Sequence, residues 1–401
     1  MVTPNPLTRK EIQAVAHSNT VFHQLLHLLE RHDFCKIERN GFRPKRKYRT
    51  LNRWGQFVVM MFAQVTARSS LRDIVHQFRF QTARLYHLGI RPVKRTTLAD
   101  ANNKRSAEFF QALFEHQYGK CISFAPRKKF RFKNKLYSFD ATTIDLCLSL
   151  FPWAKFRTTK GGIKLHTLLD HDGYIPAFIK VTAAKVADIT VAKLLRLPAF
   201  SIVVLDRAYL DFSWLHKLTE KKVFFVTRLK KKTKYRVLKR RRVINTKGLT
   251  SDHTILLTGA KANDCPIQLR RVGYRDPETG QHYVFVTNIF HLSARTIADI
   301  YRERWQVELF FKWIKQNLRI KSFFGTSKNA VMTQIWIAII TMLLLAYYKF
   351  RAKLNHSLSQ ILKLLQLNLF DRRNIWQLFD PGPTKHMLPN RDQLSLNFNQ
   401  L

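Results

Sequence analysis

Apolar residues at helical spacing dominate the first third of the chain. Four segments carry them at intervals of three and four residues, which gather apolar side chains on one face of a helix: residues 21–31, 51–67, 70–78 and 98–118. Glycine and proline separate these segments. We therefore predict an all-helical N-terminal domain over residues 1–125. Its polar faces carry Arg and Lys, notably at 43–53, so a DNA-binding role of helix-turn-helix type and a plain helical bundle are equally good interpretations.

After residue 130 the period changes from helical to alternating. Three short β-rich runs are followed by a helix, a continuous apolar strand, a second helix and a fifth strand: residues 136–146, 160–170, 174–182, 188–195, 201–206, 207–222 and 223–229. Asp172-Gly173 is a hairpin signal between the second and third runs. This order is that of the ribonuclease H-like α/β fold, and we predict a mixed-sheet core over residues 130–228 and 287–355.

A β-rich insertion is predicted to interrupt this core at residues 229–286. It opens with a basic run in which ten of the fifteen residues from 228 to 242 are Lys or Arg. This run is interpreted either as a solvated strip or as a contact for DNA phosphates. Strand-like segments follow. Beyond the insertion we predict one helix over 293–318 and a long apolar helix over 331–350. Residues 356–401 are assigned to a C-terminal tail, with little periodicity from about 368.

The large net positive charge of the chain indicates which kind of partner it binds. Lys and Arg number 70 against 26 Asp and Glu, a net charge of +44, which favours an anionic partner and DNA first. The four cysteines are far apart and form no C-x-x-C pair, so neither a zinc site nor a disulfide framework is indicated. The longest apolar run, 335–348, is too short for a membrane span, and the N-terminus lacks the apolar region of a signal peptide. We expect a cytoplasmic protein with no membrane partner.

The segment 301–315, YRERWQVELFFKWIK, sets Tyr301, Arg304, Glu308 and Lys315 on one edge of the predicted helix, within an arc of roughly 60°. An acid among bases suits an anionic ligand. Arg304, Glu308 and Lys312 are also spaced as a solvent-exposed ladder of ion pairs, and from this helix alone the ladder is the better interpretation.

Two aspartates change that balance. Asp140 lies inside the first strand, where Thr142 shares its face and Asp145 points to the opposite one. Asp206 ends the buried fourth strand, at the sheet edge where α/β proteins bind ligands, although it could also cap the helix that follows. Strands one and four are neighbours in the predicted fold. With Glu308, these carboxylates suit Mg²⁺ or Mn²⁺, and two such ions could promote an in-line displacement at phosphate.

These residues also resemble a known family. The spacing of Tyr301, Arg304, Glu308 and Lys315 is similar to the Y-(2)-R-(3)-E-(6)-K signature of DDE transposases encoded by bacterial insertion sequences, in the IS-four family. SFDATTIDL and VVLDRAYLDF resemble that family's first and second aspartate motifs, and FFVTRLKK its usual continuation. FAQVTARSSLRDI, LYHLG and TTLADAN resemble the helical domain often found before this core.

The resemblance implies an enzyme that binds the inverted-repeat ends of its element, cleaves DNA there and joins the released 3′-hydroxyl to target DNA. Asp140, Asp206 and Glu308 would hold two Mg²⁺ ions, with Mn²⁺ as a substitute. Tyr301, Arg304 and Lys315 would contact DNA phosphates. A homodimer in the synaptic complex and a place at the bacterial nucleoid are also implied.

Two other functions remain open at this point. One is a metal-dependent nuclease without strand transfer, and the other is an inactive DNA-binding derivative. Some members of the family excise through a DNA hairpin, with a tryptophan of the insertion stacked on a flipped base. Here no Trp lies between Trp214 and Trp305, so Tyr274, Tyr283 or Phe285 would have to substitute.

Overall fold

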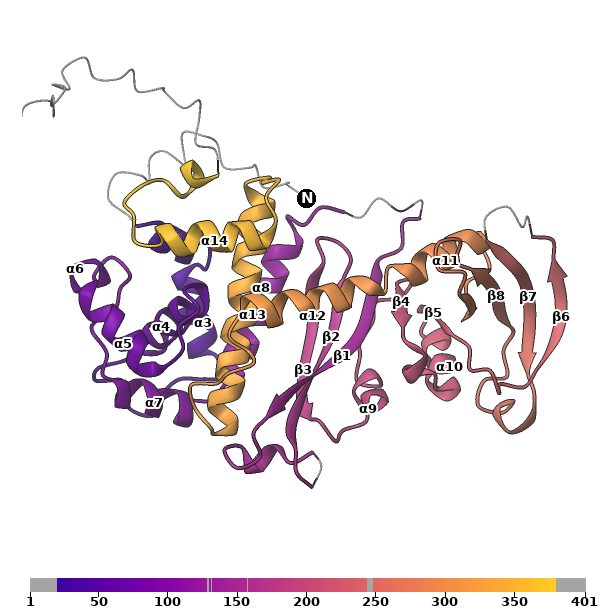
Figure 1. Cartoon of the computed structure of the whole chain (residues 1–401), viewed down its shortest axis with the longest axis horizontal. Helices are drawn as coiled ribbons and strands as arrows, with labels where there is room; N and C mark the ends of the chain where they lie inside the picture. The colour runs from indigo at the N-terminus through magenta and orange to yellow at the C-terminus, as the bar shows by residue number, and fades with distance from the viewer. Residues whose placement is uncertain (1–19, 128–129, 131, 157, 244–247, 380–401) are drawn as a thin grey trace, which may run out of the picture.

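The computed structural model describes residues 20–127, 130, 132–156, 158–243 and 248–379. It is elongated, with helices at one end and strands at the other (Figure 1). The predicted assignments for residues 1–19 and 380–401 lie outside the described residues.

The N-terminal region is helical, as predicted. Its helices are α2 (Val21–Leu26), α3 (Arg31–Arg39), α4 (Arg53–Val65), α5 (Leu71–Phe80), α6 (Thr82–Leu85), α7 (Arg95–Lys104) and α8 (Glu108–Ile122). Helix α3 was not predicted, because its sequence RHDFCKIER is mostly polar and buries only Phe34. The single helix predicted over 98–118 was wrong: the chain turns between α7 and α8.

Tertiary contacts hold that turn. The Asn329 side chain donates to the Arg105 carbonyl over 2.6 Å and accepts from the Ala107 N–H over 3.1 Å. The Arg105 guanidinium donates to Gln56 Oε1 over 3.2 Å. Backbone groups freed by the turn are thus satisfied by residues far away in sequence, which a local apolar pattern cannot reveal.

The long apolar helix is the centre of the helical end. Helix α13 (Lys328–Arg351) packs against α4, α7 and α8 and, with α14 (Leu358–Asn368), shares one hydrophobic core with them. With 24 residues it is long and apolar enough to cross a membrane, but 94% of its most apolar window is buried inside the protein. It is therefore accounted for as a core helix. The predicted C-terminal tail contains α14, which opens on a capping box of Ser357 and Gln360, and the short η5 (Ile375–Leu378).

One nine-stranded sheet fills the rest of the molecule, in the order β3-β2-β1-β4-β5-β9-β8-β7-β6. The first five strands are β1 (Leu136–Leu146), β2 (Gly161–Asp170), β3 (Ile175–Ala183), β4 (Ile202–Leu205) and β5 (Phe224–Arg228). Strands β1 to β3 form an antiparallel meander, while β4 runs parallel to β1 and β5 parallel to β4. The predicted ribonuclease H-like mixed sheet is confirmed.

The β-rich segment extends this sheet. Its strands are β6 (Tyr235–Arg241), β7 (Leu249–Leu257), β8 (Leu269–Arg275) and β9 (His282–Thr287), and β9 pairs antiparallel with β5. Much of the basic run that we predicted as a solvated strip or phosphate contact is the edge strand β6. Its charges discourage another chain from pairing with the open edge.

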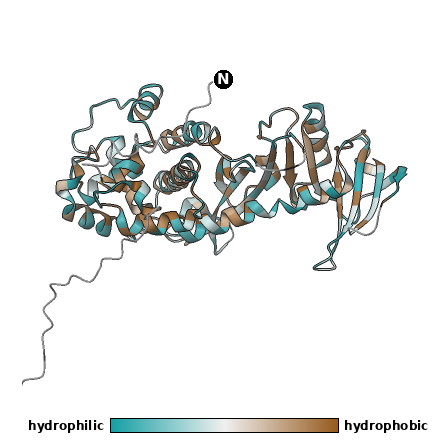
Figure 2. Ribbon diagram, turned by 90° about the horizontal axis from the view of Figure 1, so that it is seen from above, coloured by the Kyte–Doolittle hydropathy of each residue, from teal (hydrophilic) through white to brown (hydrophobic). Residues whose placement is uncertain are grey.

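Alternating side chains build a core on each face of the sheet. Val203, Leu205 and Phe225 pack under α9 (Asp188–Ala192) and α10 (Phe212–Glu220), whereas Val204 and Val226 pack under α11 (Ala294–Arg302). In Figure 2 the middle strands are largely brown, while teal marks the outer surfaces of the helices.

Candidate active site

Strands β1 and β4 bring two aspartates to the same place. Phe139 pairs with Leu205 in parallel register, and Asp140 and Asp206 are the next residues of the two strands. Each lies an even number of residues from a strand residue of the core under α11, Asp140 from Leu136 and Asp206 from Val204, so both side chains point to that face. Asp206 also caps the short helix η2 (Arg207–Tyr209) by accepting from the Ala208 N–H over 3.4 Å.

The predicted helix over 293–318 was wrong as a single helix. It is α11 followed by α12 (Trp305–Asn317), so Tyr301 lies in the last turn of one helix while Glu308 and Lys315 lie on the other. At the junction, the N–H groups of Arg304 and Val307 bond three residues back, to Tyr301 over 3.0 Å and to Arg304 over 3.2 Å. Hydrogen bonds to the third residue back are those of a 3₁₀ turn, which is tighter than an α-helical turn. The chain between α11 and α12 is therefore a tight turn and is not unwound.

Side chains on both sides of this tight turn reach the sheet. Glu303 Oε2 lies 3.6 Å from His171 Nδ1 and accepts from the Tyr174 hydroxyl over 3.4 Å, at the β2–β3 hairpin. Arg304 points to β1. The turn is thus anchored by contacts with the sheet, which cannot be predicted from the sequence of the turn itself.

Arg304 joins two of the three predicted acids. Its Nη1 donates to Asp140 Oδ2 over 3.2 Å and its Nη2 to Glu308 Oε1 over 2.6 Å, and the side chain is 15% exposed. The Arg304–Glu308 pair of the predicted ladder is therefore present, but it is turned inward onto Asp140. Lys312 is exposed.

Lys315, on α12, contacts β1 two to three residues beyond Asp140. Its Nζ donates to Thr142 Oγ1 over 2.6 Å and to the Thr143 carbonyl over 2.9 Å. Thr142 shares the face of Asp140, so Arg304, which precedes α12, and Lys315 on α12 both reach the same face of β1.

A second arginine, Arg228 at the end of β5, holds Asp206. Its Nη2 donates to Asp206 Oδ1 over 3.0 Å. We did not predict this contact. Its sequence signal is positional: β5 is parallel to β4, so the residue that ends β5 lies beside the acid that ends β4.

The two aspartates differ in their proton affinity. Burial raises the pKa of Asp140 to about 6, and the charges of Asp206 and Glu308 add to the increase, while the Ala141 N–H and Arg304 oppose it. Burial also acts to raise the pKa of Asp206, but hydrogen bonds from the Arg207 backbone and the Arg228 side chain bring it below its ordinary value. Burial thus disfavours the ionised form of Asp140, while hydrogen bonds favour the ionised form of Asp206.

The three acids offer the donor atoms of a divalent-cation site, but in this structure they are not gathered around one point. The three side chains supply carboxylate oxygens, the ligands preferred by Mg²⁺ and Mn²⁺. Within the described ranges, no three His, Cys, Asp or Glu side chains are close enough together to hold a metal ion. The Arg304 guanidinium supplies the positive charge between Asp140 and Glu308, so a metal ion would have to displace it.

An aromatic cavity of about 670 Å³ adjoins these residues. Its ring-bearing lining residues are Tyr274, Tyr283, Phe285, Tyr301 and Trp305. Tyr301 is 8% exposed and packs on Phe285 with ring centroids 4.7 Å apart, while Phe285 stacks on Tyr283 at 6.0 Å. Trp305, which we did not predict as a site residue, is 54% exposed. The lining can contact a planar apolar group.

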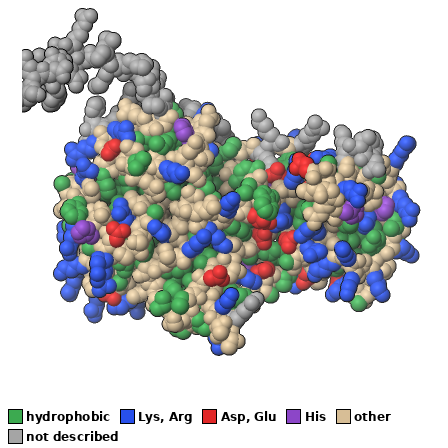
Figure 3. All heavy atoms as spheres, in the orientation of Figure 1, with side chains coloured by type: hydrophobic (Ala, Val, Ile, Leu, Met, Phe, Trp, Pro, Cys, Tyr) green, Lys and Arg blue, Asp and Glu red, His purple; other side chains and the backbone are tan. Residues whose placement is uncertain are grey.

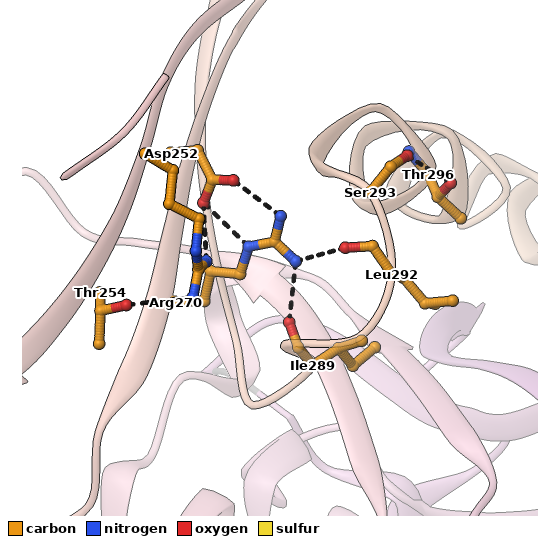
Figure 4. A network of polar contacts seen from close by, with 8 residues as sticks. Asp252, Thr254, Arg270, Ile289, Leu292, Ser293 and Thr296 are labelled. Atoms are coloured by element: carbon orange, nitrogen blue, oxygen red, sulfur yellow. Dashed lines mark hydrogen bonds and ion pairs between the residues drawn. The ribbon is translucent and has the colours of Figure 1, made fainter. Parts of the chain in front are cut away.

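Figure 4 shows how the insertion fixes the start of α11. Arg270 on β8 forms a buried two-bonded ion pair with Asp252 on β7, over 2.9 and 2.8 Å. The same guanidinium donates to the Ile289 carbonyl over 3.2 Å and to the Leu292 carbonyl. Ser293, the next residue, caps α11. The path from β9 to Tyr301 is thus held by the insertion.

His166 lies outside this group. It is fully buried, its Nε2 lies 2.9 Å from Thr182 Oγ1, and burial lowers its pKa to about 4. His166 is thus a packed core residue.

Known proteins are similar to this chain in sequence. A sequence profile of the transposase DDE domain matches residues 131–344, and one of a domain of unknown function (DUF4372) matches residues 17–91. A putative transposase, y4zB, of Sinorhizobium fredii is 32% identical over 310 residues, covering 75% of this chain and 85% of that protein. A probable transposase for the insertion sequence element IS5377 of Geobacillus stearothermophilus is 35% identical over 242 residues, which cover 59% of this chain and 63% of that protein.

Among solved structures, a synaptic complex of piggyBac transposase with hairpin DNA aligns with a TM-score of 0.46 and 11% identity, over 91% of this chain and 81% of that one. That likeness is too weak to support any conclusion. The profile match extends over more than half of the chain and spans Asp140, Asp206 and Glu308. The chain therefore belongs to the DDE transposases, the family encoded by bacterial insertion sequences.

Proposed function

We propose that this transposase binds the inverted-repeat ends of its insertion sequence, cleaves the DNA there and joins the cut ends to target DNA. The observation that carries the proposal is the meeting of Asp140, Glu308 and Arg304, beside Asp206 on the neighbouring strand. Three strand- and helix-borne acids with basic neighbours suit chemistry at a phosphodiester.

Asp140, Asp206 and Glu308 are the residues that would hold two divalent ions, Mg²⁺ or Mn²⁺. When bound, such ions activate the attacking oxygen and stabilise the leaving oxygen of an in-line displacement. Transposases of this family depend on divalent metal ions in general, and the hard oxygen donors here agree with that chemistry.

Arg304, Lys315 and Tyr301 would then contact the DNA phosphates. Arg304 is bound to the acids in the free protein, and a phosphate of the DNA offers its guanidinium a second, two-bonded partner. Lys315 lies along the same face of β1 through Thr142. No acceptor for the Tyr301 O–H is found within the described residues, so this donor would serve a phosphate that reaches it.

The aromatic cavity is the place for an unstacked base, if excision passes through a DNA hairpin. Tyr274, Tyr283 or Phe285 would take the part of the tryptophan that the insertion lacks, since any aromatic face can stack on a base. Exposed Trp305 is an additional candidate for that contact.

The assembly and the location are part of the proposal. Joining two DNA ends brings at least two active sites together, which a homodimer in the synaptic complex would achieve. The net charge of +44 suits binding to DNA at the bacterial nucleoid, in the cytoplasm.

The proposal is tested with purified protein, Mg²⁺ and a plasmid carrying both ends of the insertion sequence, together with a supercoiled target plasmid. Cutting at the ends followed by joined end–target products is the expected result. Cutting without joining would identify a nuclease, and specific binding without cutting an inactive derivative, so either outcome would overturn the proposal.

A further inference from the structure

A second cavity, of about 600 Å³, lies beyond Asp206 at the carboxyl ends of β4 and β5. Its charged lining residues are Arg207, Arg228, Lys231 and Arg271, and His282 also contributes. No Asp or Glu is among the described residues that line it. We call it the basic cavity. In Figure 3, Lys and Arg side chains crowd the β-rich end of the molecule, whereas Asp and Glu gather nearer the middle.

The basic cavity lies largely on the other face of the sheet from the three acids. Its apolar lining residues Leu229 and Val284 belong to the core under α10, while Asp140 and Asp206 lie on the strand face that carries the core under α11. Arg228 and Tyr283 line both this cavity and the aromatic cavity, so they form the wall between them. A phosphate in the basic cavity is therefore not the phosphate at the acids.

Two arginines of the basic cavity are held in place by other residues and still have an N–H donor without an acceptor. Arg271 donates to Ser251 Oγ over 2.8 Å and lies 5.7 Å over the Tyr235 ring, yet its buried Nε has no hydrogen-bond partner within the described residues. The Nε of Arg228 is likewise unpartnered there. Buried donors without partners cost free energy until an acceptor arrives. Arg207 and Lys231 are exposed at the mouth.

From this arrangement we propose that the basic cavity binds a second phosphodiester group of DNA, separate from the one that is cut. The inference rests on the proposed function, because it assumes that DNA lies across Asp140 and Asp206. Arg207 directly follows Asp206, so a strand that passes the acids can continue around the end of β4 into the cavity. The group belongs either to DNA flanking the transposon end or to target DNA, which have the same chemistry.

The test compares the double variant Arg207→Gln/Lys231→Gln with the charge-matched control Arg196→Gln/Lys217→Gln, whose residues are exposed outside the cavity. Binding of labelled duplexes is measured against NaCl concentration in EDTA. We expect the cavity variant to bind about tenfold more weakly than the control. The slope of log K against log salt should be smaller by about one to two units, since each lost phosphate contact removes about 0.9.

Three DNA substrates separate the sources: a transposon end with flanking DNA, the same end without flanking DNA, and pre-cleaved ends with a supercoiled target plasmid. A loss seen only with a transposon end that carries flanking DNA assigns the phosphate to the flank. A loss seen only in joining of pre-cleaved ends to a supercoiled plasmid assigns it to the target. If the cavity variant equals the control on all three substrates, the inference is wrong.

Folding and dependence on the proposed function are controlled separately. Because Arg271 is part of a packed contact, Arg271→Lys is tested beside the double variant, and it should show the same direction of change with an unaltered circular dichroism spectrum. If wild-type protein fails to recognise or cut the ends, the proposed function fails. The cavity is then still judged by the difference between variant and control on plain plasmid DNA.

Discussion

Arg304 donates from Nη1 to Asp140 Oδ2 over 3.2 Å and so connects the start of α12 to the middle of β1. With its second bond, to Glu308, the guanidinium neutralises two of the acids that we assign to metal binding. The same side chain is our candidate for a DNA phosphate contact. In the free protein, Arg304 therefore competes with the metal ion for the acids.

Replacing Arg304 with Ala should make Mn²⁺ bind the DNA-free protein more tightly, by about tenfold, which corresponds to about 1.4 kcal/mol. Affinity for the DNA end should fall at the same time. Calorimetric titration with Mn²⁺ and fluorescence anisotropy with an end duplex measure the two effects. Arg302→Ala, at an exposed position two residues earlier, is the matched control. Weaker or unchanged Mn²⁺ binding in Arg304→Ala would show that the guanidinium is not a competitor.

The buried pair in the insertion predicts a loss of stability. Asp252→Ala leaves the Arg270 guanidinium buried without its carboxylate, and removing one partner of such a pair costs about 3–5 kcal/mol. Urea denaturation followed by circular dichroism measures the free energy of unfolding. Asp264→Ala removes the exposed pair with Lys261 and should change it by less than about 1 kcal/mol. Equal effects of the two variants would remove the basis for the insertion holding α11.

His166 predicts a dependence of stability on pH. Burial lowers its pKa to about 4 in the folded protein, below the ordinary 6.5, so the unfolded chain takes up a proton first as the pH falls. Stability from the neutral imidazole is complete above pH 6.5 and is lost toward pH 4, by at most about 3 kcal/mol. His166→Gln should flatten this part of the curve of unfolding free energy against pH. The exposed His76→Gln should leave it unchanged, and a curve that stays equally steep in His166→Gln would contradict the assignment.

The local pattern of apolar and polar residues was enough to predict the elements whose periodicity and flanking turns are present in their own sequence. Strand β1 was predicted with the bounds it has, because its alternating side chains and flanking turns are both present in its sequence. The pairing of β1 with β4 followed from the order of the elements, and it placed Asp140 beside Asp206.

The features that could not be predicted from the sequence depend on contacts between residues far apart in the chain. The tight turn after Tyr301 is held through Glu303 and Arg304 by residues of the sheet. The role of Arg228 depends on the neighbouring strand, and that of Asp252 on Arg270 and the loop before α11. None of these contacts leaves a periodic signal along the chain.

The central claim is that Asp140, Asp206 and Glu308 act together in cutting DNA. The most direct measurement is Mg²⁺-dependent cleavage of a duplex carrying the inverted repeat, by wild type, Asp140→Asn, Asp206→Asn, Glu308→Gln and Asp145→Asn. Asp145 is on the same strand as Asp140 but points to the opposite face and is exposed. We predict that the first three variants bind the duplex and do not cut it, while Asp145→Asn cuts like wild type. Normal cutting by Glu308→Gln would contradict the account and leave Arg304 and Glu308 as a structural ion pair.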